Sequence, residues 1–154
     1  ALKGSVSLVE ADRNITTFLR SGLDSRAENY YNMLAAWSVA QSRNFGRVSA
    51  ASGLGVETLV WTTSGDEVVC PTCLSLEGMR FSVGSLYDKM AEYADAVNTE
   101  VAKTVLPWLK AEEGYFSFGE ETVEVTQDNS EILISNGIGI PPIHGECRCE
   151  LEAE

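Results

Sequence analysis

All four cysteines and the single histidine of this 154-residue chain fall into two short clusters. The first is Cys70-Pro71-Thr72-Cys73, and the second, about 70 residues further on, is His144-Gly145-Glu146-Cys147-Arg148-Cys149. Thiolate sulfur and imidazole nitrogen are the ligands that zinc prefers, usually four in a tetrahedron, and a C-x-x-C pair can bind one ion from a tight turn. The two clusters therefore predict a zinc site with five candidate ligands: Cys70, Cys73, His144, Cys147 and Cys149.

Two choices of ligands are compatible with the spacing in the second cluster. Two residues lie between His144 and Cys147, as between Cys70 and Cys73, and this is the spacing of a metal-binding turn. Cys147 and Cys149, two residues apart on a predicted strand, would project from the same face. The spacing leaves open which four of the five donors bind the ion. If both clusters bind the same ion, residues 70–149 form a closed loop and the metal helps to determine the fold.

Disulfide bonds are the alternative use of four cysteines. The N-terminal stretch up to Leu19 does not have the basic start and uninterrupted apolar run of a secretory signal. This favours an environment of reduced thiols, in which clustered cysteines more often bind a metal or act in catalysis. A disulfide between the two clusters would nevertheless join the same two segments of the chain.

A catalytic use of the same residues is the second alternative. His144 could act as a base for a Cys147 nucleophile, with Asp66 orienting the imidazole. A catalytic zinc would instead keep one coordination position for water beside three protein ligands. Nucleophilic catalysis leaves three of the five donors without a role, and four or five available ligands favour a closed structural site. We therefore expect that the chain is not an enzyme.

The N-terminal third reads as two helices. The first ends at Ser21-Gly22. The second begins at Ser25, which forms a capping box with Glu28, and stops at Gly46. Its apolar residues recur at helical spacing and predict a stripe that packs on a core.

Strand patterns then bring the chain to the first cluster. Residues 56–63 are rich in β-branched and aromatic side chains, and after a turn at 64–67 Val68 and Val69 lead back toward Cys70. This predicts that the first cysteine pair lies at the end of a hairpin. A short strand is predicted at 80–83.

The stretch between the clusters has its own predicted elements. A helix begins at Ser85, continues to Val105 and is stopped by Pro107. Alternation over 122–126 and 131–135 predicts a second hairpin, and the extended segment 140–143 then leads to His144. The predicted fold is therefore α+β: N-terminal helices packed on a small antiparallel sheet, a helix-plus-hairpin insertion, and a zinc site that joins the mid-chain and C-terminal clusters.

Composition and charge limit the partners. A content of 44% apolar residues is enough for one domain core, and no stretch approaches the roughly 20 apolar residues that cross a bilayer, which predicts a soluble protein without membrane contact. The net charge is −12. Residues 1–55 carry six basic and four acidic residues, whereas 112–131 carry seven acidic residues and no basic one. Such an acidic chain is poorly suited to bind nucleic acid directly.

The combined pattern resembles the signature of the phage head morphogenesis proteins, the minor capsid proteins of the Mu F type. The pattern is a strand ending in Trp, an Asp, C-x-x-C, a Leu-x-Gly step and P-P-x-H-x-x-C-R-C, and it covers roughly residues 30–83 and 138–150. The matching residues are Trp61, Asp66, Cys70, Cys73, Leu76, Gly78, Pro141, Pro142, His144, Cys147, Arg148 and Cys149. The resemblance implies an N-terminal helical segment (1–46), a Mu F-type motif domain (47–150) with an insertion at about 79–140, and an acidic tail (151–154).

The resemblance also implies a function. Proteins of this family are structural virion components of tailed bacteriophages. They lie inside the head near the portal, are present in the host cytoplasm during assembly, and act in head assembly and genome packaging and delivery. The implied partner is the portal protein, with capsid or scaffold protein and, indirectly, packaged DNA as further partners, and no small-molecule substrate. The alternatives that remain are a Cys/His- or zinc-dependent hydrolase and a small zinc-stapled interaction module.

Overall fold

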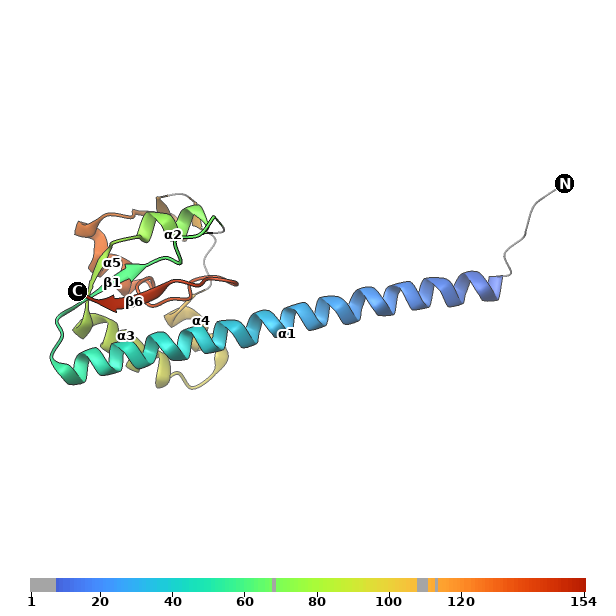
Figure 1. Cartoon of the computed structure of the whole chain (residues 1–154), viewed down its shortest axis with the longest axis horizontal. Helices are drawn as coiled ribbons and strands as arrows, with labels where there is room; N and C mark the ends of the chain where they lie inside the picture. Colours follow the sequence, from blue (N-terminus) through green and yellow to red (C-terminus); the bar gives the residue numbers. More distant parts are fainter. Residues whose placement is uncertain (1–7, 68, 108–110, 113) are drawn as a thin grey trace. The chain divides into compact units, whose positions relative to one another are not determined.

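The computed structural model describes residues 8–67, 69–107, 111–112 and 114–154. The chain divides into two compact units, Ala1–Ala35 and Ala36–Glu154. The helix α1 (Leu8–Leu54) contributes to both of them (Figure 1). In the first unit the side chains of Leu23, Tyr30 and Tyr31 are exposed, and the two tyrosine rings meet edge to face with their centroids 6.1 Å apart. None of the helices in the described ranges has both the length and the apolar composition to cross a membrane.

Helix α1 is the first correction to the sequence prediction. Two helices separated at Ser21-Gly22 and ending at Gly46 were expected, but one helix runs through both glycines to Leu54. A single glycine costs a helix only about 1 kcal/mol relative to alanine, which strong neighbouring helix formers can offset. The helix ends instead at Gly55, whose φ of 72° is the left-handed conformation of a helix C-terminus. The predicted division at residue 46 therefore falls inside α1.

The second unit contains the small antiparallel sheet that was predicted. Its strand order is β2-β1-β6, with β1 (Thr58–Thr62) between β2 (Arg80–Ser82) and β6 (Glu150–Ala153). The C-terminal residues predicted as an acidic tail thus form an edge strand, and Leu151 pairs with Trp61. Leu151 is fully buried, which explains why this end of the chain is ordered into the sheet.

Side-chain amides cover both outer edges of this sheet. On β2, Gln127 accepts from the Arg80 N–H (2.9 Å) and donates to the Arg80 carbonyl (2.7 Å). Beside β6, Asn44 of α1 accepts from the Leu151 N–H (2.9 Å) and donates to the Cys149 carbonyl (3.4 Å). Exposed edge strands invite pairing with other chains, and these amides occupy backbone groups that would otherwise be available.

The stretch between the clusters differs from the prediction in its helices. The expected helix 85–105 is two helices, α3 (Val83–Ala94) and α4 (Thr99–Val105). Helix α3 begins earlier than expected because the Ser82 hydroxyl accepts from the Ser85 N–H, and Asn98 caps α4 by accepting from Val101.

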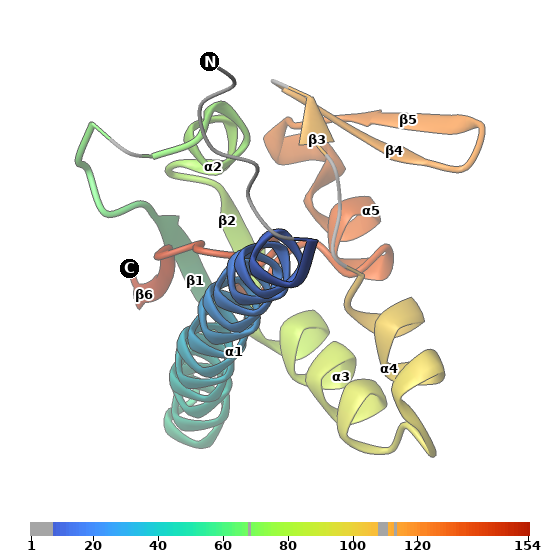
Figure 2. The same ribbon diagram turned by 90° about the vertical axis from the view of Figure 1, so that its right-hand side faces the viewer.

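The predicted second hairpin is wrong in its pairing. Strand β5 (Glu121–Glu124) pairs with β4 (Tyr115–Phe118), which also pairs with the short β3 (Ala111–Glu112). The residues expected to form the partner strand, 131–135, lie in the helix α5 (Ser130–Ser135), which follows the 3-10 turn η1 (Gln127–Asn129). Figure 2 shows β3, β4 and β5 as a sheet separate from β1, β2 and β6.

The core of the second unit joins the sheet β2-β1-β6 to the helices α1, α2, α3 and α5 and to β4. The C-terminal part of α1 packs against the sheet β2-β1-β6, and the residues between β2 and the second cluster add α3, α5 and β4 to the same apolar cluster. The sequence-predicted insertion is therefore an integral part of the core. The fully buried larger side chains of the core include Leu59, Trp61, Leu76, Phe81, Leu86, Phe116, Leu133, Ile138 and Leu151.

Candidate metal centre

The first cysteine pair is positioned by a helix start, where a hairpin end was predicted. Cys70 is the N-cap of α2 (Pro71–Leu76), and its Sγ accepts a hydrogen bond from the Cys73 N–H at 3.3 Å. Pro71 suits the first helical position because it has no N–H to leave unpaired. Val69 belongs to no strand, and Val68 lies outside the described residues. The turn directs both sulfurs to the same side and places an amide at one of them.

The second cluster follows a buried segment that was predicted to be extended but contains bends and a cis peptide bond between Pro141 and Pro142. Residues 138–143 are all buried, so the backbone that leads to His144 is fixed by packing. A tight turn follows, in which the Cys147 N–H donates to the His144 carbonyl and Glu146 has a φ of 63°. Cys147 and Cys149 precede β6, so the expectation that they lie on a strand is wrong, although both are buried as that expectation implied.

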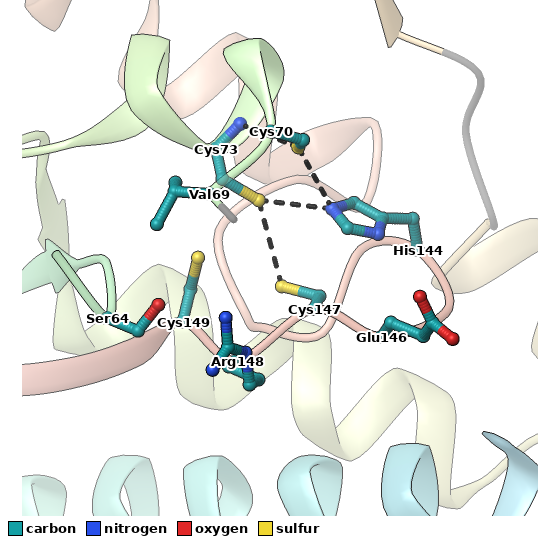
Figure 3. A pocket seen from close by; sticks show the side chains of 9 residues that line it. All are labelled: Ser64, Val69, Cys70, Cys73, His144, Glu146, Cys147, Arg148 and Cys149. Carbon is teal, nitrogen blue, oxygen red and sulfur yellow. Dashed lines mark hydrogen bonds between the residues drawn. The ribbon is translucent and has the colours of Figure 1, made fainter. Parts of the chain in front are cut away.

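The two clusters meet at Cys73. His144 Nε2 lies 3.2 Å from Cys70 Sγ and 3.1 Å from Cys73 Sγ, and Cys73 Sγ lies 3.9 Å from Cys147 Sγ (Figure 3). Two triads can be drawn, Cys70–Cys73–His144 and Cys73–Cys147–Cys149, and within each the donor atoms lie within 4.8 Å of one another. All five sequence-predicted ligands are thus brought together, with Cys73 common to both triads.

These separations are close to those of a metal-ligand set. Two sulfurs bound to one zinc ion at about 2.3 Å in a tetrahedron lie about 3.8 Å apart. The Cys73–Cys147 separation of 3.9 Å is close to this value. The cysteines are all free thiols, so none of them is withdrawn from the cluster by a disulfide bond. The donors present therefore fit a metal ion that prefers sulfur and nitrogen.

The imidazole of His144 points its Nε2 atom at the sulfurs of Cys70 and Cys73. Its Nδ1 is hydrogen-bonded to the Gly145 carbonyl oxygen, which can only accept. Nδ1 is therefore a hydrogen-bond donor, and Nε2 is the ring nitrogen that faces Cys70 and Cys73. A hydrogen bond on the far nitrogen is the usual way in which proteins fix the orientation of a metal-binding histidine.

The pKa values of the three thiols in the second triad depend on one another. Hydrogen bonds from Cys149 and Cys73 lower the pKa of Cys147 to about 2, against the opposing effect of burial. The hydrogen bond with Cys147 raises the pKa of Cys149 to about 12, and hydrogen bonds with Cys147 and Cys149, together with burial, raise the pKa of Cys73. A bound cation would favour the thiolate form of these cysteines.

An ion pair beside the cluster ties the loop after β1 to the second cluster. Arg148 Nη2 lies 2.9 and 2.8 Å from the two carboxylate oxygens of Asp66, and Asp66 also accepts from the Ser64 hydroxyl. Both charged side chains are about half exposed, so the pair contributes little to stability by itself. Asp66, weighed above as the group that orients the imidazole, instead pairs with Arg148, while His144 Nδ1 bonds to Gly145.

Sequence reasoning missed the support that α1 gives to this region. Asn44 is fully buried and holds the backbone on both sides of Glu150, and the Glu150 carboxylate accepts from Arg43 (2.9 Å) and from Arg47. In the sequence, the sign of this support is Asn44, a residue with an amide side chain inside the apolar stripe of a predicted helix. Its partners, more than 100 residues away, could not be identified from the stripe.

No family model, no curated protein and no solved structure matches this chain.

Proposed function

We propose that the cluster of Cys70, Cys73, His144, Cys147 and Cys149 binds one structural zinc ion, and that the chain is a zinc-stabilised structural protein. The observation that carries this proposal is the convergence of the two separate segments, with all five sulfur and nitrogen donors, on Cys73. When bound, zinc would link α2 to the segment that enters β6. The site would then hold the two ends of a long intervening stretch together.

Within the five donors, the contacts favour Cys70, Cys73, His144 and Cys147 as the ligands. Hydrogen-bond-range contacts link these four in sequence: Cys70 to His144, His144 to Cys73 and Cys73 to Cys147. Along the chain, Cys70 with Cys73 and His144 with Cys147 each lie in a tight turn with two intervening residues. This spacing is common in structural zinc sites. Cys149 then stays beside the site as a buried thiol.

Three observations favour a structural role over hydrolysis. His144 Nδ1 bonds to a backbone carbonyl and so lacks the carboxylate that orients a catalytic base. Asp66, the acid considered as the group that orients the imidazole, pairs with Arg148. The cavity at the cluster has a volume of only about 20 Å³, far below the roughly 300–1,000 Å³ of small-molecule sites.

Metal content and coordination test this proposal. The chain, purified under reducing conditions, should retain one zinc per molecule, and its cobalt-substituted form should show the absorption of tetrahedral Co²⁺ with thiolate ligands. Cys149→Ser should retain the ion, whereas Cys73→Ser should lose it. A reduced wild-type chain that holds no zinc would overturn the proposal, and a bound water in place of the fourth protein ligand would favour hydrolysis.

We further propose that the protein is a minor head protein of a tailed bacteriophage, associated with the portal. This proposal rests on the sequence signature. Distant parts of the signature lie close together, the two clusters at Cys73 and Arg148 on Asp66, which is compatible with this proposal and equally with a small zinc-stapled interaction module. A signature whose members share one structural site is expected of a structural motif.

Association with the portal tests this second proposal. The proposal predicts that a portal gene lies beside the gene for this chain, and that the full chain co-purifies with the co-expressed product of that gene. A truncated chain, residues 36–154, should show whether unit Ala1–Ala35 carries the contact. The cut is made at residue 35 because a cut at residue 46 would remove the helix turns that bear Asn44. Absence of the chain from purified virions would contradict the proposed role.

A further inference from the structure

Helix α1 touches the chain immediately after the metal-binding cluster. Asn44 bridges the Cys149 carbonyl and the Leu151 N–H, and Arg43 and Arg47 both bind the Glu150 carboxylate. Three consecutive residues of the C-terminal segment are thus held by one and a half turns of the helix. The first of them, Cys149, belongs to the cluster itself.

The Asn44 contacts are buried and specific. Asn44 is 0% exposed, and its amide donates to the Ala40 and Cys149 carbonyls while its oxygen accepts from Leu151. A buried amide without such partners would cost about 1–3 kcal/mol per unsatisfied group, so the side chain and the segment fix each other's position. Moving the backbone at Cys149 would break these bonds.

Resting on the proposed zinc site, we propose that Asn44 is a positioning residue for the metal centre, so that metal binding and the docking of the C-terminal part of α1 stabilise each other. The Asn44 amide holds the backbone at Cys149, two residues from the proposed ligand Cys147, and thereby keeps the Cys147 sulfur at Cys73. Because coupling between two events is reciprocal, metal binding must then strengthen the docking of residues 41–51.

The opposite edge of the same sheet supplies a matched control. Gln127 bridges the Arg80 N–H and carbonyl on β2 with the same amide chemistry that Asn44 uses at β6. The bridge of Gln127 lies on the other edge strand, and Arg80 is no member of the cluster. Loss of the Gln127 amide should affect the sheet edge without affecting the metal.

The test compares Zn²⁺ affinities, measured by competition with a chromophoric chelator, for wild type, Asn44→Ala and Gln127→Ala. Removing a supporting residue around a metal site typically weakens metal binding 10- to 100-fold. We expect a loss of about tenfold or more for Asn44→Ala and less than about twofold for Gln127→Ala. Equal affinities of the two variants would overturn the proposal.

A measurement on the unmodified chain keeps the proposal testable if Asn44→Ala fails to fold. Removal of Zn²⁺ from the wild type should raise hydrogen exchange in residues 41–51 more than in α3. Exchange in 41–51 that does not depend on the metal would contradict the coupling. A wild type that binds no zinc refutes the zinc site and this inference together, whereas a zinc-binding wild type with unaffected Asn44→Ala refutes this inference alone.

Discussion

The stability of the protein should depend on free zinc with the slope of a single ion. Five donors are too few to complete two tetrahedral zinc sites, so we expect one ion. Each tenfold rise in free zinc above the dissociation constant should then add about 1.4 kcal/mol to the free energy of unfolding. For a domain of this size that gain raises the melting temperature by roughly 5 °C per decade of zinc.

The assay is thermal unfolding in zinc buffers that span several decades of free metal under reducing conditions. Two ions, one in each triad, would double the slope, and zinc binding by the unfolded cysteines would lower it. Cys73→Ser removes the sulfur common to both triads, so its melting temperature should not depend on zinc. A wild-type melting temperature that stays constant over the whole range would refute the reasoning about the site.

Two further predictions concern the structure around the site. Gly137→Ala should destabilise the protein by about 2 to 5 kcal/mol in urea unfolding, because φ is +85° and the added Cβ would lie 2.5 Å from the Val105 carbonyl oxygen. Gly22→Ala, on the open surface of α1, is the control and should stabilise by up to about 1 kcal/mol; equal effects would contradict the packing argument. Glu150→Gln should cost less than about 1 kcal/mol at pH 7, since the pair with Arg47 is part-exposed. Hydrogen bonds from the arginines, Arg47 first, lower the pKa of Glu150, so its contribution is present above the ordinary carboxyl pKa and lost as the pH falls through the lowered one. The difference between variant and wild type in urea titrations should therefore vanish on acidification, and a constant difference would refute this cause.

The candidate metal ligands could be predicted from the sequence because their chemistry is carried by residue type. Cysteine and histidine are few in this chain, and their clustering around two positions pointed to one site. The structure brings all five together at Cys73. The spacing could not decide among the five, because a turn and a strand both bring neighbours at two- or three-residue steps to the same side.

Secondary structure was predicted well for strands β1 and β2 and poorly for the residues before the second cluster. Strand β1 and strand β2 lie within one or two residues of the predicted ranges. Residues 131–135 form α5, although the apolar run from Ile132 to Ile134 also suits a short buried strand. A run of five residues fits both periods, and only tertiary packing, here the burial of Leu133 and Ile134 against the core, decides between them.

The errors in helix α1 have a different origin. Gly22 and Gly46 were taken as helix ends because glycine often follows a helix. An added Cβ would meet no atom within 4 Å at either position, so neither glycine serves a close approach, and each costs only its backbone entropy. Glycine at a real helix end is marked by a positive φ, as at Gly55, and this cannot be read from the residue type.

The C-terminal segment is the point at which the proposed metal site and the architecture depend on each other. Strand β6 is only four residues long and lies at a sheet edge, with the cluster immediately before it. Its ladder with β1, the Asn44 amide and the Glu150 ion pairs fix it on one side, and the donors at 144–149 fix the chain that enters it. A short edge strand contributes little stability by itself. A metal ion that fixes the residues before β6 would therefore stabilise the sheet and the docked helix as well, and loss of the ion should affect these elements before the β3-β4-β5 sheet, which supplies no residue to the cluster.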